Sequence, residues 1–109
     1  MIYTIEEIKE KIRPIAEKYN LPAVYLFGSY ARGEADEKSD IDIMIDRTGA
    51  DFSKPFAYFG LFDDFSDMLS KEVDMITTAA LTKTDDRHFR NAVQKEMVQI
   101  YAGQYKQAG

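Results

Sequence analysis

The sequence predicts a small α/β domain with a three-stranded mixed sheet, strand order 1-2-3, and helices packed mainly on one face. Three apolar runs have the length of strands, at residues 23–27, 40–45 and 73–77. A helical crossover between the second and third runs predicts that these strands are parallel neighbours, and we expect the first strand to be antiparallel to them. The chain of 109 residues fits one domain over residues 1–109, with a frayed tail at 103–109.

The N-terminal segment is predicted to form an amphipathic helix. Thr4 and Glu7 have the spacing of a capping box, and apolar residues recur at helical spacing as far as Tyr19. Pro14 removes one hydrogen bond inside this helix, and its ring clashes with the carbonyl of Glu10, four residues earlier. We therefore expect the helix to bend or to restart just before Pro14.

The first strand is predicted to run directly into a glycine turn. Residues 23–27 are apolar and rich in β-forming side chains, which favours a strand buried on both faces. The turn that follows reads Gly28-Ser29-Tyr30-Ala31-Arg32-Gly33. We expect a short helix inside it, ended by the second glycine.

The second strand alternates in character from one residue to the next. Because side chains alternate across a strand, Ile41, Ile43 and Ile45 share one face. Asp40 and Asp42 share the opposite face. Two carboxylates are therefore predicted to project side by side from a strand whose other face is apolar.

The second half of the chain is predicted to contribute a helix, the third strand and a closing helix. A turn around Gly49 precedes a helix that starts near Pro55. The apolar residues at helical spacing in that helix are Tyr58, Phe62, Phe65 and Leu69. The third strand, residues 73–77, carries Asp74 between apolar neighbours. The closing amphipathic helix is predicted from Phe89, Val93, Met97 and Ile100.

The aromatic stretch from Phe52 to Phe65 holds more apolar residues than one helical stripe can bury. They are Phe52, Phe56, Tyr58, Phe59, Leu61, Phe62 and Phe65. Either these side chains fill the core of a small domain and cover its loops, or some are exposed and mark a protein interface.

Composition excludes several classes of function. Zero cysteines rule out disulfides and thiolate metal sites, and the single His88, which we expect at the surface or as a cap, cannot supply a zinc ligand set alone. The net charge of −5 argues against stable binding of long nucleic acids, although it can also serve solubility alone. With neither a secretion signal nor an apolar run of about 18 residues, we expect a cytoplasmic protein that binds no membrane.

The three aspartates Asp40, Asp42 and Asp74 are predicted to converge if the second and third strands are adjacent. Like charges ~4 Å apart repel by roughly 4 kcal/mol at an effective dielectric constant near 20. Such a cluster therefore takes up protons or binds a hard divalent cation. Mg²⁺ prefers oxygen ligands and completes its shell with phosphates and water.

Gly28 and Ser29 are candidates for a phosphate-binding turn. Glycine at a strand-to-helix junction lets the backbone approach a ligand closely, and free N–H groups at a helix start attract anions. Phosphate on this turn and metal on the aspartates would form the two halves of a nucleotidyl-transfer site. Each feature alone is usually just a turn or a solvated strand face, but their fixed spacing favours function.

Together, Gly28-Ser29-Tyr30-Ala31-Arg32-Gly33 and Ser39-Asp40-Ile41-Asp42 resemble the signature of the polymerase-beta-type nucleotidyltransferase superfamily. In its short length the chain resembles the minimal nucleotidyltransferase (MNT) family, the antitoxins paired with helical HEPN ribonuclease toxins. The resemblance implies the nucleotidyltransferase fold and ATP as substrate. It implies that Gly28 and Ser29 hold the nucleotide phosphates.

The resemblance also assigns the aspartates. It implies that Asp40 and Asp42 bind metal and that Asp74 is the third carboxylate, which orients metal and acceptor. Two Mg²⁺ ions are expected, with Mn²⁺ as an alternative. Arg32 either reaches a phosphate or is a solvated or salt-bridged surface residue.

The expected function is transfer of AMP from ATP to a hydroxyl, on a tyrosine of a cognate HEPN toxin, which would make the protein an antitoxin. This follows from the resemblance and not from the residues themselves. Two alternatives stay open. One is a non-catalytic antitoxin that neutralises the toxin by covering it, and the other is an enzyme that nucleotidylates a small molecule.

Overall fold

The computed structural model describes residues 2–50 and 57–103, which contain a four-stranded mixed sheet of order β3-β2-β1-β4. The strands are β1 (Ala23–Phe27), β2 (Ile41–Asp46), β3 (Val73–Thr77) and β4 (Val98–Ala102). β1 is antiparallel to β2 and to β4, while β2 is parallel to β3. The predicted order and directions of the first three strands are confirmed.

The fourth strand corrects the predicted closing helix. Helix α5 (Arg87–Glu96) ends one residue before Met97, whose backbone is extended, and β4 pairs with the free edge of β1. Pairing along this edge satisfies backbone groups that would otherwise stay open, and this gain outweighs the helical spacing of the apolar residues. Of the two predicted helix positions here, Ile100 is buried and Met97 is 38% exposed. Of the expected tail at 103–109, Gly103 is held to the sheet region, because its amide donates to the Pro22 carbonyl at 2.8 Å, and residues 104–109 lie outside the described residues.

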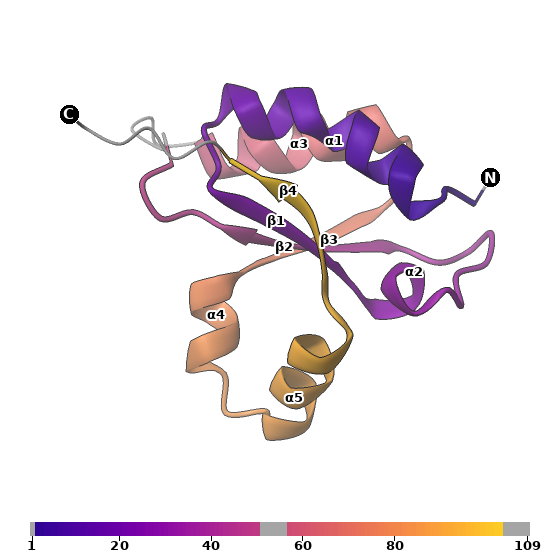
Figure 1. Cartoon of the computed structure of the whole chain (residues 1–109), viewed down its shortest axis with the longest axis vertical. Helices are drawn as coiled ribbons and strands as arrows, with labels where there is room; N and C mark the ends of the chain where they lie inside the picture. Colours follow the sequence, from indigo (N-terminus) through magenta and orange to yellow (C-terminus); the bar gives the residue numbers. More distant parts are fainter. Residues whose placement is uncertain (1, 51–56, 104–109) are drawn as a thin grey trace.

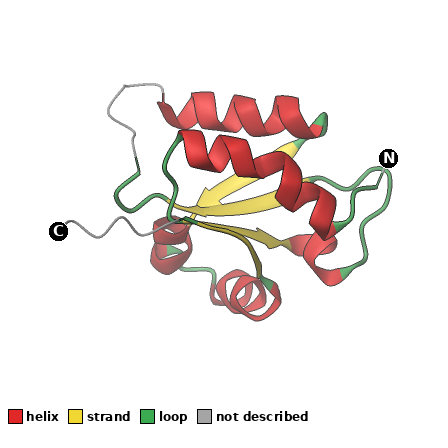
Figure 2. Ribbon diagram, turned by 45° about the horizontal axis from the view of Figure 1, so that its top comes forward, coloured by secondary structure: helices red, strands yellow, loops and turns green. Residues whose placement is uncertain are grey.

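Helices cover the two faces of the sheet unequally. The long helices α1 (Ile5–Lys18) and α3 (Ala57–Leu69) lie side by side over one face, as predicted (Figure 1). Two shorter helices, α4 (Thr78–Lys83) and α5, lie against the opposite face (Figure 2). The second face of the sheet is therefore only partly open.

Helix α1 runs unbroken through Pro14, so the expected restart does not occur. The capping box is present, with the Thr4 amide donating to Glu7 at 2.9 Å and the Glu7 amide donating to Thr4 at 3.1 Å. Pro14 is exposed, while Ile12 and Ile15 on either side of it are buried against the sheet. Burial of that apolar face holds the helix together despite the missing hydrogen bond.

The main core lies between the sheet and the long helices. It buries Ile8, Ile12, Ile41, Ile43, Ile45, Leu61, Phe65 and Leu69, among others. The predicted apolar face of β2 is thereby confirmed. A smaller cluster on the opposite face consists of Phe27, Met44, Leu81 and Val93.

Some side chains of the aromatic stretch are buried in the core and others are exposed, so both predicted arrangements occur. Phe65 is fully buried, Tyr58 and Phe62 are partly buried, and Phe59 is 64% exposed. Phe52 and Phe56, together with the predicted helix start near Pro55, lie outside the described residues. Within residues 2–50 and 57–103, no helix combines the length and the apolar character needed to cross a membrane.

We predict that Ile100→Ala lowers the free energy of unfolding by about 2–5 kcal/mol, because it leaves a cavity under β4. Met97→Ala should cost less than about 1 kcal/mol, since that side chain is largely solvated. Urea unfolding of both variants measures the difference. Equal, large losses would contradict β4 and favour the helical stripe in which both residues are buried.

Candidate functional site

Asp42 and Asp74 lie side by side where β2 and β3 pair. They are register partners in the parallel ladder, and a side-chain hydrogen bond joins their carboxyl groups. Both project from the face opposite to Ile41 and Ile43, because side chains alternate along each strand. The predicted meeting of these two aspartates is thus observed.

The electrostatics of this pair centre on Asp42. Burial, followed by the negative charges of Asp74 and Asp40, raises the pKa of Asp42 to about 6. The hydrogen bond that protonated Asp42 donates to the Asp74 carboxylate raises this pKa further, and the Arg32 guanidinium lowers it. Asp40 and Asp74 are both exposed. The cluster thus carries negative charge that a proton or a cation can offset.

The negative charge of Asp40 helps to raise the pKa of Asp42, but Asp40 does not form a three-carboxylate metal site with Asp42 and Asp74 in this structure. Across the described residues, no three Asp, Glu or His side chains gather tightly enough to hold a metal ion together. The donor chemistry nevertheless fits Mg²⁺, because Asp42 and Asp74 present paired carboxylate oxygens with uncompensated charge. Such a pair usually supplies only part of the shell, and phosphates and water supply the rest.

Gly28 packs directly against Asp42. It has a φ of +73°, and a Cβ at this position would overlap Oδ2 of Asp42. Gly28 opens the short helix α2 (Gly28–Arg32), which Gly33 ends in the left-handed conformation, as predicted. Glycine is therefore required at residue 28 both for the turn and for the close approach to the carboxylate.

Glu96 is a site residue that sequence reasoning missed. Its Oε1 accepts a hydrogen bond from the Gly28 amide at 3.0 Å, and its Oε2 accepts one from Nη1 of Arg32 at 3.1 Å. Arg32 also donates from Nε to Glu34 at 3.2 Å, which is the salt-bridged alternative considered for this residue. These two carboxylates raise the pKa of Arg32.

The Glu96 carboxylate thus accepts a hydrogen bond from the Gly28 amide, which is predicted to bind a nucleotide phosphate. Both groups that it contacts, a backbone N–H and a guanidinium, are typical partners of phosphate oxygens. No local pattern in the sequence indicates this contact, because Glu96 lies in the last turn of α5, 68 residues from Gly28.

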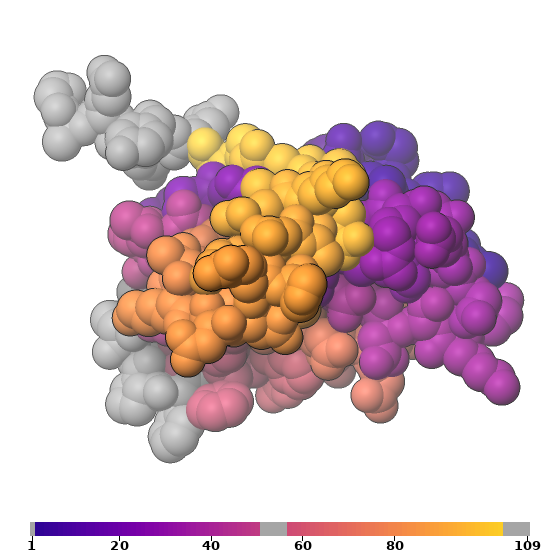
Figure 3. All heavy atoms as spheres, turned by 90° about the horizontal axis from the view of Figure 1, so that it is seen from below, coloured from indigo at the N-terminus to yellow at the C-terminus, as the bar shows by residue number. Residues whose placement is uncertain are grey.

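A cavity of about 460 Å³ joins these groups. It is lined by Phe27, Gly28, Ser29, Arg32, Asp42, Phe89, Ala92, Val93 and Glu96. Figure 3 shows this face of the molecule, with α5 in orange beside α2 in purple. The cavity brings the glycine turn and Asp42 together, as predicted. His88, also on α5, is exposed, as expected for a surface residue.

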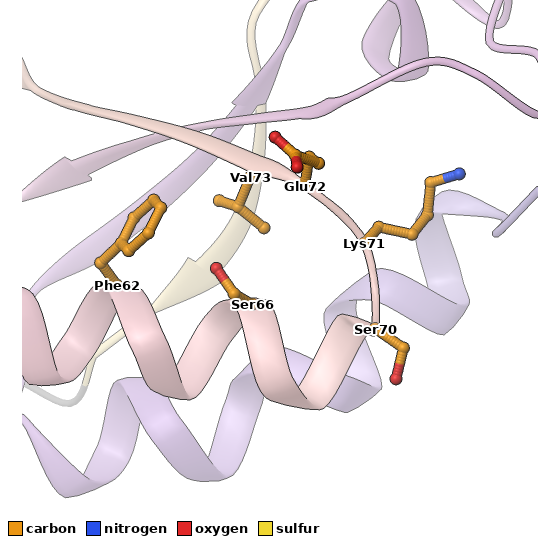
Figure 4. Close-up of a pocket in the computed structure, with 6 residues that line it drawn as sticks. All are labelled: Phe62, Ser66, Ser70, Lys71, Glu72 and Val73. Atoms are coloured by element: carbon orange, nitrogen blue, oxygen red, sulfur yellow. The ribbon is translucent and has the colours of Figure 1, made fainter.

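A second cavity, of about 520 Å³, lies between α3 and β3 (Figure 4). Phe62 and Ser66 point into it from the helix, and Val73 faces them from the strand. Val73 belongs to the core under the long helices, whereas its neighbour Asp74 projects from the other face. This cavity is therefore separate from the aspartate pair.

Comparison with known proteins identifies the family. Residues 10–105 match the family described as Polymerase beta, Nucleotidyltransferase. A relative from Methanocaldococcus jannaschii, provisionally named a protein adenylyltransferase, is 33% identical over 102 residues, which cover 89% of this chain and 98% of the relative. The chain therefore belongs to the polymerase beta nucleotidyltransferase family.

Solved structures share the fold. A toxin–antitoxin structure with AMP-PNP has 26% sequence identity and a TM-score of 0.64, over 88% of this chain and 74% of the other. A complex of an MNT antitoxin with a tri-AMPylated HEPN toxin from Shewanella oneidensis has 22% identity and a TM-score of 0.60, over 91% of this chain and 73% of the other. At that identity the second likeness shows the fold alone.

We predict that Asp42→Asn stabilises the metal-free protein at pH 7 by about 1 kcal/mol, allowing for solvent screening of a half-buried carboxylate. The folded pKa of about 6 exceeds the ordinary value of 3.8, so the folded state holds a proton that the unfolded chain releases. Stability from this group is therefore present at low pH and lost as the pH rises through that window.

Urea unfolding from pH 4 to 8 in the presence of a chelator measures this effect. Asp46→Asn, at the other end of β2, is the matched control. A difference between wild type and Asp42→Asn that does not change with pH would contradict the raised pKa.

We also predict that Gly28→Ala destabilises the protein more than Gly33→Ala does. Both glycines have a φ of +73°, but only Gly28 would place its new Cβ on Asp42, and nothing lies within 4 Å of that position at Gly33. Gly33→Ala should cost about 1–2 kcal/mol in backbone strain. Gly28→Ala should cost about 1–3 kcal/mol more, from overpacking. Equal costs in thermal unfolding would contradict the close approach.

Proposed function

We propose that this member of the polymerase beta nucleotidyltransferase family transfers AMP from ATP to a hydroxyl of a partner protein. The observation that carries the proposal is the Asp42–Asp74 pair, which lies next to the Gly28 turn and in which burial and the neighbouring negative charges raise the pKa of Asp42. Paired carboxylates beside a glycine turn at a helix start are suited to binding a triphosphate together with its metal ions.

The aspartates would bind the metal, and the glycine turn would bind the phosphates. Asp42 and Asp74 would hold Mg²⁺, and Asp40, whose charge already raises the pKa of Asp42, would supply a third carboxylate. Two such ions would neutralise charge on the phosphates and polarise the attacking oxygen. Gly28 and Ser29 hold the phosphates through backbone and hydroxyl groups.

The reaction balances as a displacement at the α-phosphorus of ATP. The acceptor oxygen forms a bond to the α-phosphorus. The bond between the α-phosphorus and the oxygen that bridges to the β-phosphate breaks, so diphosphate leaves. The proton of the acceptor hydroxyl passes to a nearby carboxylate. Asp74 is suited to that role because it is exposed, whereas Asp42 is half-buried.

We further propose that the acceptor is a tyrosine of a cognate HEPN toxin and that the modification makes this chain an antitoxin. The name of the Methanocaldococcus jannaschii relative, a provisional protein adenylyltransferase, supports a protein acceptor. The toxin–antitoxin structure at 26% identity, which holds AMP-PNP, supports a toxin partner and an adenine nucleotide. The site opens on an exposed carboxylate, which an acceptor from another chain can reach.

We predict that the purified protein, with ATP and Mg²⁺, adds AMP to the protein encoded by its neighbouring gene. Asp42→Asn should slow this transfer by about 100-fold or more, because it removes charge stabilisation at the reacting centre. The intact mass of the partner gives the readout.

Asp46→Asn, which changes an aspartate at the far end of β2, is the control and should transfer AMP normally. A stable complex without any gain in mass would favour neutralisation by binding alone. Modification of a small molecule in place of the partner would contradict the protein acceptor.

We predict that Glu96→Gln tightens the binding of a non-hydrolysable ATP analogue by about threefold or more. The carboxylate of Glu96 competes with phosphate for the Gly28 amide and Arg32, and the variant removes its charge. Glu34→Gln is the control, because Glu34 contacts Arg32 but not Gly28. Weaker binding by Glu96→Gln would show that Glu96 supports the nucleotide site and does not compete with the phosphate.

A further inference from the structure

One aromatic ring in the candidate site has no role in the transfer chemistry described above. Phe89 is 40% exposed, one of few large apolar side chains left so open among the described residues. It lines the same cavity as Gly28, Ser29 and Asp42. An exposed aromatic ring in a cavity that also contains polar groups is suited to a ligand with a flat apolar face.

The position of this ring is well defined by its neighbours. The Phe89 amide donates to the Asp86 side chain at 2.9 Å, which fixes the first turn of α5. The ring meets Phe27 edge to face, with centroids 6.2 Å apart and an angle of 84° between the planes. Phe27 is itself buried, so it supports Phe89 from the side of the sheet.

The ring also lies near the predicted phosphate turn. Phe27 immediately precedes Gly28, so the ring that contacts Phe27 stands beside the start of the turn. The wall of the cavity next to Phe89 is apolar, formed by Ala92 and Val93. One end of the cavity is therefore polar and acidic, and the other is apolar and aromatic.

We propose that Phe89 is the stacking platform for the base of the bound nucleoside triphosphate. This inference rests on the proposed nucleotide site and adds a base subsite to it. With the phosphates at Gly28 and Ser29, the base extends along α5 and stacks on the exposed face of Phe89. Stacking on an aromatic ring tolerates different bases, so Phe89 contributes to affinity and positioning without choosing the base.

The test compares two ligands on matched variants. Binding of a non-hydrolysable ATP analogue and of inorganic tripolyphosphate, both with Mg²⁺, is measured by calorimetry. Phe89→Ala should weaken binding of the ATP analogue by about tenfold and leave tripolyphosphate binding unchanged. Phe59→Ala is the control, since Phe59 is even more exposed but lies on α3, outside this cavity.

Two further variants separate stacking from packing. Phe89→Leu keeps an apolar side chain against Phe27 but has no ring, so it should behave like Phe89→Ala. Phe89→Trp keeps a stacking surface and should bind the ATP analogue at least as well as the wild type.

The outcomes are distinct. Unchanged affinity of Phe89→Ala for the ATP analogue would overturn the base platform and leave the nucleotide site standing. An equal loss for both ligands would also overturn it, since Phe89 would then only support the shape of the site. Failure of the wild type to bind either ligand would overturn the nucleotide site itself, and the platform with it.

Discussion

The parallel pairing of β2 with β3 is the constraint on which the rest of the site depends. It sets Asp42 opposite Asp74 and, through the alternation of side chains, directs both away from the core that Ile41 and Ile43 enter. Shifting the register by one residue would turn the aspartates into the apolar core and the isoleucines outward, at a large cost. The free energy gained by burying the isoleucines in the core therefore also keeps two mutually repelling carboxylates close to each other.

That repulsion explains the surroundings of the pair. Gly28 contributes no side chain, which lets the backbone lie on the Asp42 carboxylate. Arg32 is the positive group that opposes the raised pKa of Asp42, yet it is also bound to Glu96 and Glu34. The site is thus built with more negative than positive charge, a state suited to a substrate that brings cations with it.

Much of this arrangement could be predicted from the sequence because it follows from local periods. The alternation in β2 and the helical crossover to β3 were enough to place Asp42 beside Asp74. β4 was missed because Met97 and Ile100 also fit a helical period, and the choice of strand depends on a free edge of β1 far away in the sequence. Glu96 and Phe89 reach the cavity only through the packing of α5 beside α2, which no local pattern encodes.

The most direct test of the central claim is calorimetric titration of Mg²⁺ into the nucleotide-free protein at pH 6, in buffers of different ionisation enthalpy. If Asp42 and Asp74 form the metal site, Mg²⁺ binding releases protons, because Asp42, with a pKa of about 6, is partly protonated at that pH. Asp74→Asn should then weaken the binding sharply. Binding without proton release, with the same affinity in Asp74→Asn, would contradict a metal site on this pair.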